Sequence, residues 1–586
     1  MSARFIPTWF KQLRDCPTSY IGHAGKSVTV KSDESGLQFT TPSGGGSSKS
    51  DTDLYLVTEY GAVADGKNVQ SGAITAGSNI LNINVRTTTS PTTAPGWKPP
   101  DYESQFTFLD IGKNIILTGA GAGGSILKTT ITGCNSTTQV TLAVAASTTV
   151  TTDMPVSWGT DNTAAFQSAL DDVVQIKKKG TIGVPNGKYL FLGYLEWPKC
   201  DLINGGLVGG SISFKGINSA IPELYSYRDV TAPVLMITDE VNNFIQFKKY
   251  AKTVYGTLNV ISAGPTTISN LVFYHPNQIK VTGDAAASTP LTYPWTISTD
   301  VGGVVNISIR DCLFVNSYKA IFYGSTRGNL HNLKIGAFNT GIEIDGIYDF
   351  VFIEDIEILP AFAAFIEGLG AGGTTNVELT YCRNNLYGMI IKYCDALTVK
   401  GFTMFNGYAG IYCTTSSLGS GYGSLNGLHL DSVYHGIIID NTKGPGWSIV
   451  DYHAEIFSYS GTSAIWLKAG GLVGAASWTG GGYYNSGNNP IKADAGITGT
   501  LKISNVNYVP DMAVAYMSGT EMINDRTAIA IGTRTPKQAL DVRGNIKIGK
   551  DTTVFTSVTG GEMRYDSATG KFQGYNGITL TWDNLN

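Results

Sequence analysis

Six carboxylic acids lie within 15 residues of a chain that is otherwise poor in charge: Glu343, Asp345, Asp349, Glu354, Asp355 and Glu357. Charged residues make up 15% of the 586 residues, against about 25% in ordinary globular proteins. Paired carboxyl groups perform glycoside hydrolysis, in which one donates a proton and the other acts as nucleophile or base. We therefore predict a catalytic site in this segment, with Glu343, Asp345 and Glu354 among its catalytic residues.

The elements that must position these acids follow from an internal repeat. A small residue followed by alternating apolar residues recurs at intervals of 21, 23, 24, 22, 26 and 28 residues, at Ala320, Gly341, Ala364, Gly388, Gly410, Gly436 and Ala464. An Asn, Asp or Gly corner keeps the same spacing, with one 46-residue gap that equals two repeats, at Asn270, Asp311, Asn332, Asp355, Gly401, Gly427 and Asp451. Repeats of this length are typical of the coils of a parallel β-helix, in which three short strands meet at corners.

Equivalent positions on stacked coils form columns, and two neighbouring columns hold residues suited to sugar binding. The position two after each small residue holds Phe322, Glu343, Ile366, Ile390, Tyr412, Ile438 and Trp466. Two places further lie Gly324, Asp345, Gly368, Lys392, Thr414, Asp440 and Lys468. Because a pyranose ring stacks on an aromatic face, we predict that Tyr412, Trp466, Lys392 and Asp440 bind substrate. The alternative is that these aromatic residues are buried at a subunit interface.

A third column lies just before the corners and holds Arg310, His331, Glu354, Glu378, Lys400 and Asn426. If the register is unbroken, Glu354 and Glu378 lie on adjacent coils about 5 Å apart. That separation suits the two carboxyl groups of a retaining glycoside hydrolase. We therefore add Glu378 to the predicted catalytic residues and Lys400 to the substrate-binding ones. The competing interpretation is that Lys400 and Arg310 form ion pairs with the two glutamates on a solvated face.

Two histidines, His429 and His453, fall at equivalent places on neighbouring coils. They are suited to act as the base of a lyase or as a pair of metal ligands, and the simpler interpretation is a polar surface. We expect no metal and no cofactor.

Composition excludes several classes of protein. The chain has 71 glycines, and its 41 Lys and Arg nearly balance 45 Asp and Glu, which argues against helical bundles, disordered acidic proteins and basic nucleic-acid binders. We expect no nucleic-acid partner and, without a run of about 18 apolar residues, no membrane insertion. Pro7 and Lys11 interrupt the stretch where a signal peptide needs apolar residues. We therefore expect synthesis in a host cytoplasm without an export signal.

Motifs near both ends and around the start of the repeats carry a family resemblance. TSYIGHAGK at 18–26 and GLQF at 36–39 are similar to attachment segments of phage tail proteins. YGAVADG at 60–66, GTDNTAAF at 159–166 and GVPNGKY at 183–189 resemble the start of the pectate-lyase-like right-handed β-helix of phage tailspikes. In that family the first two pieces usually adjoin, whereas here 94 residues separate Gly66 from Asp161. TPKQALDVRGNI at 535–546 and GEMRYDSATGKF at 561–572 resemble C-terminal modules of phage tail fibres.

The resemblance and the repeats together predict an all-β fold: a right-handed parallel β-helix with small β modules at both ends. Residues 1–50 are expected to form a virion-attachment segment that ends in a Gly/Ser-rich linker, and residues 51–160 the start of the β-helix with an inserted β module. Residues 161–510 form the β-helix itself, beginning with a helix that covers its open end, and residues 511–586 a trimerisation or receptor-binding module. The resemblance also implies a homotrimer that binds a phage tail or baseplate protein through its N-terminus.

The function that we predict is that of a tailspike in the virion tail, which binds and depolymerises a bacterial surface polysaccharide, capsule or lipopolysaccharide. Hydrolysis is favoured because the acids cluster. The first alternative is a polysaccharide lyase with Lys392, Lys400 or a histidine as base. A second is a non-catalytic adhesin or structural fibre. A secreted pectinase shares the fold, but the tail-like ends and the expected lack of a signal peptide count against it.

Overall fold

The computed structural model describes most of residues 53–494, with several gaps, of which the longest are 84–103, 218–231, 280–288 and 362–376. Before residue 53 it describes a hairpin of β1 (Ser27–Val30) and β2 (Leu37–Thr40), and after residue 494 only short strands. The expected linker at 42–50 lies outside the described residues. The chain divides into two compact units, Met1–Leu54 and Tyr55–Asn586.

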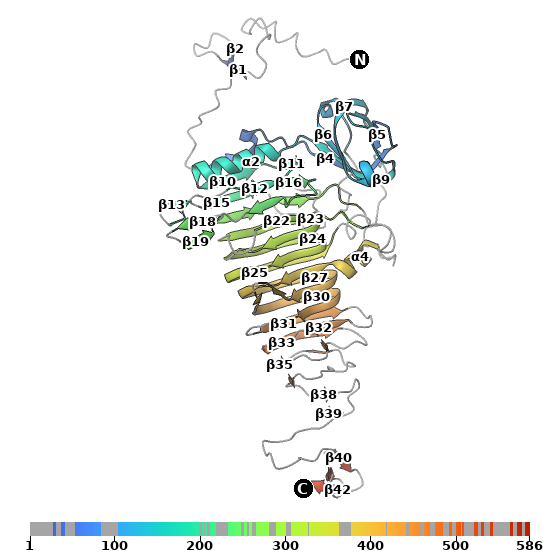
Figure 1. The fold of residues 1–586 in the computed structure, drawn as a ribbon, viewed down its shortest axis with the longest axis vertical. Coiled ribbons are helices and arrows are strands. Elements are labelled where there is room, and N and C mark those ends of the chain that lie inside the picture. The colour runs from blue at the N-terminus through green and yellow to red at the C-terminus, as the bar shows by residue number, and fades with distance from the viewer. Residues whose placement is uncertain are drawn as a thin grey trace. The chain divides into compact units, whose positions relative to one another are not determined.

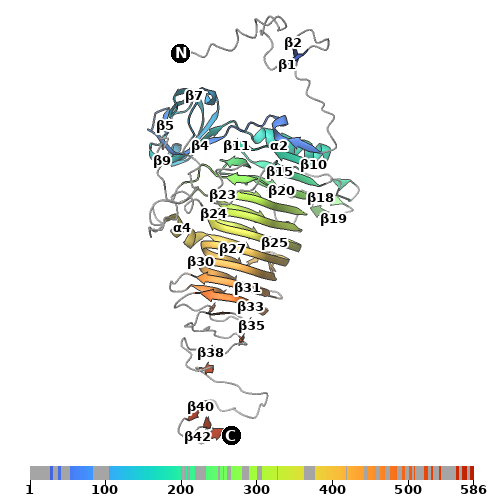
Figure 2. The same ribbon diagram turned by 180° about the vertical axis from the view of Figure 1, so that it is seen from behind.

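The second unit is built on a parallel β-helix, as the repeats predict (Figures 1 and 2). The first coil consists of β10 (Gly180–Val184), β11 (Gly187–Phe191) and β12 (Leu195–Trp197). The second consists of β15 (Ile212–Gly216), β16 (Pro233–Ile237) and β17 (Ile245–Phe247), and the third of β20 (Thr266–Ser269), β21 (Val272–Tyr274) and β22 (Trp295–Ser298). Each strand pairs in parallel with its counterpart in the next coil, so three sheets run along the stack.

In the later coils the strands run together around the corners. These coils are β23 (Ile307–Tyr323), β24 (Gly328–Ile344), β25 (Ile347–Pro360) with β26 (Tyr387–Ile391), β27 (Cys394–Cys413), β30 (Gly423–Asp440), β31 (Trp447–Ile456) with β32 (Ser463–Lys468), and β33 (Ala475–Tyr484) with β34 (Ile491–Ala493). Beyond them, β35 (Thr500–Ser504) and β36 (Asn507–Tyr508) pair in parallel with β33, and β37 (Glu521–Asn524) pairs in parallel with β35.

The seven predicted corners all adopt the left-handed backbone conformation. Their φ angles lie between 48° and 66°, at Asn270, Asp311, Asn332, Asp355, Gly401, Gly427 and Asp451. Only Gly, Asn and Asp visit this region routinely, because other side chains clash with the backbone there. Neighbouring corners also bond to one another: Asn332 Nδ2 donates to Asp311 Oδ1 at 2.8 Å. The corner series is therefore confirmed as the feature that turns the chain from one sheet to the next.

One predicted coil does not exist. β24 pairs directly with β26 (Ile342 with Met389), and β25 pairs directly with β27 (Ile353 with Val399). Gly341 and Gly388 are therefore one coil apart, and the prediction of an intervening coil through Ala364 and Glu378 is wrong. Between Pro360 and β26 the structure describes the helix α4 (Val377–Asn385), which carries Glu378, whereas residues 362–376, with Ala364 and Ile366, lie outside the described residues.

The core lies inside the coils and consists of stacked apolar side chains. One column of buried residues runs through ten successive coils: Ile182, Phe214, Ile268, Ile309, Leu330, Ile353, Val399, Leu425, Ile449 and Trp478. Because strand side chains alternate between the two faces, each inward residue leaves its neighbours on the outer surface. The outer columns therefore keep the register that the core sets.

Residues 163–177 form the predicted helix, as α2 (Thr163–Asp171) followed by the π-helical turn η4 (Asp172–Lys177). Asp161 Oδ1 accepts from the backbone N–H of Thr163 at 3.0 Å and of Leu192 at 3.2 Å, which fastens the start of the helix to the first coil. Phe166 is fully buried, with ring centroids 5.3 Å from Tyr189 and 4.8 Å from Phe191. The role of this helix in covering the open end of the stack stays a prediction.

The inserted module is a closed antiparallel barrel. Its six strands are β4 (Lys67–Ile74), β5 (Ile80–Ile83), β6 (Asn114–Leu117), β7 (Leu127–Ser136), β8 (Gln139–Leu142) and β9 (Val150–Gly159). The motif pieces at 60–66 and 159–166, which the barrel separates in the sequence, meet at the base of the barrel. Asp65 accepts from the backbone N–H and the hydroxyl of Thr160, both at 2.8 Å, and Asn162 Oδ1 accepts from the N–H of Val63 at 2.7 Å. The chain thus enters and leaves the barrel at one point.

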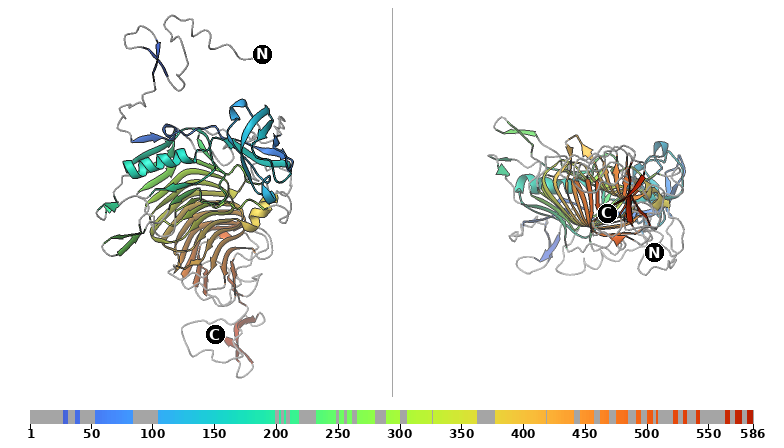
Figure 3. Two further views of the ribbon diagram at one scale, coloured as in Figure 1. Left: turned by 45° about the horizontal axis from the view of Figure 1, so that its top comes forward. Right: turned by 90° about the horizontal axis from the view of Figure 1, so that it is seen from below.

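The barrel packs on the side of the first coils (Figure 3). Asn277, fully buried next to β21, accepts from Ser157 Oγ at 2.5 Å and donates to the Ile116 carbonyl at 3.3 Å. Ile116 of the barrel also joins an apolar cluster with Val272 and Leu313 of the coils. Polar and apolar contacts together therefore fix the barrel to the stack.

Near the C-terminus, β40 (Met563–Asp566), β41 (Lys571–Asn576) and β42 (Thr581–Leu585) form an antiparallel sheet. Within the described parts of the chain, none of the helices is long and apolar enough to cross a membrane.

Candidate functional site

The predicted outer column exists in the structure, apart from one member. The register aligns Phe322, Glu343, Ile390, Tyr412, Ile438 and Trp466 on successive coils and continues to Lys492. Ile366 has no place in this column because Glu343 pairs directly with Ile390. The column therefore brings Tyr412 and Trp466 two coils apart on one outer face.

Tyr412 and Trp466 form one connected group with Asp440 and Lys468. Tyr412 Oη donates to Asp440 Oδ2 at 2.7 Å, and Lys468 Nζ lies 3.3 Å from the same carboxylate oxygen. The Lys468 ammonium also lies 5.6 Å from the ring centroid of Tyr412 and 5.5 Å from that of Trp466. Burial and the hydrogen bond to Asp440 raise the pKa of Tyr412 to about 12. Tyr412 is therefore a neutral hydrogen-bonding group at any physiological pH.

The group extends one coil beyond Trp466. Lys492 Nζ lies 3.7 Å from the ring centroid of Trp466, and Trp466 Nε1 donates to Asp494 Oδ1 at 2.9 Å. Lys492 and Asp494 were absent from the predicted site. A further step of 26 residues along the same column would have found Lys492, because it pairs with Trp466 in the register.

Two more aromatic residues that the sequence analysis missed complete this surface. The ring of Tyr387 lies 5.6 Å from Tyr412 and 5.2 Å from Tyr408. We call Tyr387, Tyr408, Tyr412 and Trp466 the aromatic strip. All four side chains are partly exposed. The strip thus offers ring faces with hydroxyl, carboxylate and ammonium groups beside them, which is the chemistry of a carbohydrate site.

The acidic cluster is largely an array of ion pairs. Lys392 Nζ lies 2.5 Å from Glu343 Oε1, Lys334 Nζ 3.6 Å from Glu357 Oε2, and Arg327 pairs with Asp349. His331 Nε2 lies 3.5 Å from Asp355 Oδ2. Each pair joins neighbouring coils, or a coil to the corner beside it. Much of the acidic density that drew attention in the sequence therefore serves to link coils.

Asp345 differs from the other acids. Its Oδ1 is buried and has no hydrogen-bond partner among the described residues. It lies two residues after Glu343, where β24 ends at the corner before β25. The structure thus leaves one carboxyl group of the predicted catalytic set without a basic partner in the described part of the chain.

The predicted pair of Glu354 and Glu378 does not form across adjacent coils. Glu354 stands opposite Lys400 on one side and His331 on the other, because no coil runs between β25 and β27. Lys400 Nζ lies 3.8 Å from Glu354 Oε1, and both side chains are well exposed. Glu354 and Lys400 thus form the exposed ion pair of the competing interpretation, and their catalytic and substrate-binding roles stay predictions. Glu378 lies on α4, away from that column.

His429 and His453 are neighbours, as the spacing predicts. They pair in the register of β30 and β31, and their ring centroids lie 4.9 Å apart. Glu455 lies beside them, with Oε1 at 3.0 Å from His453 Nε2. This group is separate from the aromatic strip, since it belongs to a different sheet of the coil.

Comparisons with known proteins give structural similarity only. No family model matches the chain, and no curated protein matches it. The chain is similar to a mutant tailspike protein of the E. coli bacteriophage HK620 in complex with a pentasaccharide, at 13% identity and a TM-score of 0.38, over 64% of this chain and 63% of that one. It thus spans less than two thirds of that protein.

Two further structures are similar at comparable levels. They are tailspike protein 3 of bacteriophage CBA120 (13% identity, TM-score 0.28, 73% of this chain and 66% of that one) and PfbA, a surface adhesin of Streptococcus pneumoniae (12% identity, TM-score 0.34, 73% and 95%). Two of these three structures are phage tailspike proteins, and the third is a bacterial surface adhesin. Because these identities and TM-scores are low, we infer the function from the residues of this chain.

Proposed function

We propose that the chain is a tailspike-type protein that binds a bacterial surface polysaccharide, capsule or lipopolysaccharide, along the aromatic strip and cleaves it by hydrolysis. The observation that carries this proposal is the group of Tyr412, Asp440, Lys468 and Trp466, in which ring faces and hydrogen-bonding groups are joined by 2.7 and 3.3 Å contacts. The tail-like motifs near both ends support a place in the virion tail.

The strip is suited to a chain of sugars rather than to a single one. Coils stack about 4.8 Å apart. Tyr387 lies one coil before Tyr412 and Trp466 lies two coils after it, so the strip extends over more than one sugar unit. Asp440 and Lys468 are already fixed by their bonds to each other and to Tyr412, so less side-chain entropy is lost when they bind hydroxyl groups. Lys492 covers Trp466 at 3.7 Å, and a sugar that stacks on that face displaces its ammonium group.

Glu343 and Asp345 are the carboxyl pair that we assign to hydrolysis. Both belong to the predicted columns next to the strip, and positions two apart on a strand lie on the same face of the sheet. Hydrolysis of a glycoside needs one carboxyl group that protonates the leaving oxygen and a second that acts as base or nucleophile. In this assignment Glu343, which lies beside Lys392, activates the water, and Asp345, which has no basic partner among the described residues, donates the proton.

The test is a digest of host capsule and lipopolysaccharide by the full chain, with products read by mass spectrometry. Oligosaccharides with one added water per cut, lost in Glu343→Gln and Asp345→Asn, are the expected result. Unsaturated product ends would instead mean a lyase with Lys392 or Lys400 as base, and sugars that bind but stay intact would mean an adhesin.

Binding is tested separately from cleavage. Tyr412→Ala and Trp466→Ala should each weaken polysaccharide binding by about 5-fold or more, if a sugar ring gains as much from stacking on an aromatic ring as a nucleobase does, about 1–3 kcal/mol. Phe108→Ala is the control, because this side chain is 79% exposed on the barrel. Unchanged binding in both strip variants would remove the strip from the proposal.

The homotrimer, the N-terminal attachment to a tail or baseplate protein and the covering role of α2 belong to the same proposal. Light scattering on the full chain measures the first. Deletion of residues 1–50 should abolish incorporation into virions and leave the coils folded; a deletion variant that fails to fold would contradict the expected linker.

A further inference from the structure

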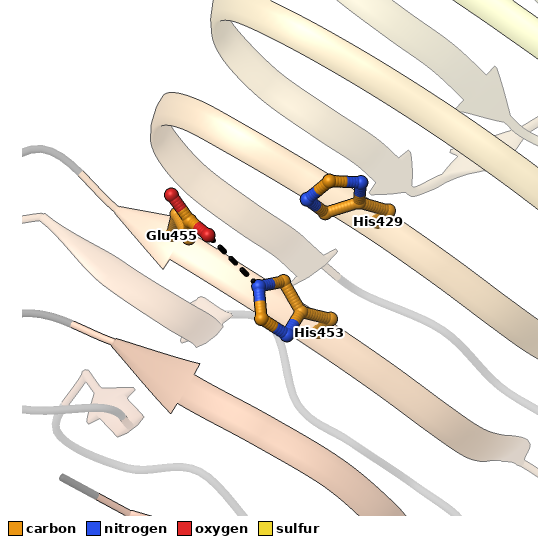
Figure 4. A group of neighbouring side chains, drawn as sticks. All are labelled: His429, His453 and Glu455. Atoms are coloured by element: carbon orange, nitrogen blue, oxygen red, sulfur yellow. Dashed lines mark hydrogen bonds and ion pairs between the residues drawn. The ribbon is translucent and has the colours of Figure 1, made fainter.

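A second group of chemically capable side chains lies outside the aromatic strip. His429, His453 and Glu455 each offer one ligand atom, and these atoms all lie within 4.8 Å of one another. His453 Nε2 is 3.0 Å from Glu455 Oε1, and the two imidazole rings are 4.9 Å apart at 74° (Figure 4). Two nitrogens and a carboxylate oxygen that converge in this way form a common ligand set for zinc.

The fold holds these three side chains on one outer face. His429 on β30 stands directly opposite His453 on β31, and Glu455 follows His453 by two residues on the same side of the strand. Their neighbours Leu428, Tyr452 and Ala454 are buried in the core, which directs the intervening side chains outward. The group is therefore positioned by the packing of two coils and does not depend on a loop.

The surroundings leave space for a ligand and favour a positive charge. The residue opposite His453 on the next coil is Gly482, which has no side chain. Glu455 stands opposite Asp431 in the register, and two carboxylates in this position repel each other. Among the described residues, neither acid forms an ion pair with a lysine or arginine. A bound cation would relieve this repulsion.

We propose that His429, His453 and Glu455 bind a divalent transition-metal ion, with zinc as the best fit. Zinc takes imidazole nitrogens and carboxylate oxygens at about 2.0–2.2 Å in a tetrahedron, and this set leaves the fourth position to water. Calcium and magnesium prefer oxygen ligands alone and do not fit two histidines. The ion links β30 to β31 across the stack. This departs from the sequence-based expectation of no metal, which treated the two histidines as polar surface.

The test is zinc binding by the full chain, produced without a polyhistidine tag and stripped with a chelator. Calorimetric titration with zinc should show one ion per chain in the micromolar range or tighter, and cobalt in its place should show the absorption bands of a tetrahedral site. His429→Ala, His453→Ala and Glu455→Gln should each weaken zinc binding at least about tenfold. His331→Ala is the matched control, since His331 is an exposed histidine with a single acidic partner.

Zinc should also raise the melting temperature of the unaltered chain and of His331→Ala, but not that of His453→Ala. Glu455→Gln keeps the size and polarity of the side chain, so it separates loss of a ligand from loss of folding. The proposal is overturned if no saturable zinc binding occurs, or if His453→Ala and Glu455→Gln bind zinc as tightly as the unaltered chain.

Discussion

His435 contacts two residues of the aromatic strip and is almost fully buried. Its ring is 4.7 Å from that of Trp466 and 5.4 Å from that of Tyr408, and its Nδ1 is 3.1 Å from Ser463 Oγ. Burial, with the nearby charges of Lys492 and Lys468, lowers the pKa of His435 from 6.5 to about 4. The folded protein therefore holds this imidazole neutral at a pH where the unfolded chain has begun to bind a proton.

This pKa predicts an acid-sensitive stability. Between pH 6.5 and about 4 the unfolded state binds more protons than the folded state, so the free energy of unfolding falls as the pH falls through that window, by up to about 3 kcal/mol. Replacing His435 with Gln should flatten the dependence, as measured by denaturant unfolding at a series of pH values. His331→Gln, an exposed control, should keep the original slope. Equal slopes for His435→Gln and the unaltered chain would contradict the pKa.

The corner residue Asn332 gives a second prediction about the stability of the protein. Its φ is 48°, and its side chain donates to Asp311, so both its backbone and its amide matter. Asn332→Ala should lower the free energy of unfolding by about 2 kcal/mol, because it loses the hydrogen bond and strains the backbone. Asn332→Gly removes only the bond and should lose less. Asn426→Ala, at an exposed strand position, is the control. A larger loss for Gly than for Ala would exclude backbone strain as the cause.

The single residues show what spacing predicts and what it does not. All seven corners were predictable because the left-handed conformation restricts the residue types. The partners of the acids were not, because Lys392 is 49 positions from Glu343 and is brought to it by the register. Glu354 and Glu378 were misplaced for the same reason. The aromatic strip was half predicted: Tyr412 and Trp466 follow the column, whereas Tyr387 and Tyr408 flank it.

Among the elements, the helix α4 could not be predicted from the spacing of the repeats. An interval of 46 residues is equally compatible with two coils and with one coil interrupted by an excursion of one repeat length. The structure has the second arrangement, because β25 pairs with β27 and no strand lies between them. The spacing of the corner residues alone does not distinguish these two arrangements.

The contact between the barrel and the coils gives a prediction at the level of elements. Asn277→Ala leaves the buried Ser157 hydroxyl and Ile116 carbonyl without this partner, which should cost about 1–3 kcal/mol. Hydrogen exchange should therefore quicken in β6 and β9 and stay unchanged in β30. Asn82→Ala, which removes an exposed amide on the barrel bonded to Gln139, should leave all three unaffected. Uniform protection in Asn277→Ala would mean that the apolar cluster alone holds the barrel.

For the molecule as a whole, the position of the barrel predicts that it can be removed. A Cβ atom on Gly159 would lie 3.0 Å from the Cα of Gly66, so the two ends of the insertion touch. A chain in which Gly66 is joined directly to Thr160 should keep its coils and unfold cooperatively, at a lower temperature because the contact surface with the barrel becomes exposed. Circular dichroism and thermal unfolding measure both.

The control for this deletion begins inside a strand. Removing residues 72–159 leaves part of β4 without its barrel partners and should give a protein that aggregates. If both deletions behave alike, the contact between Gly66 and Gly159 does not define a removable module.

The parallel pairing of the coils has a mechanical consequence. Hydrogen bonds between coils point along the stack, so a force that pulls its two ends apart loads the coil interfaces in series, and the weakest interface yields first. Successive coils from Ile321 to Ile465 take up between 21 and 28 residues wherever the chain makes no excursion, and each would release roughly 70–90 Å of extended chain. Under tension such a stack lengthens in discrete steps, whereas under compression the same interfaces are pressed together.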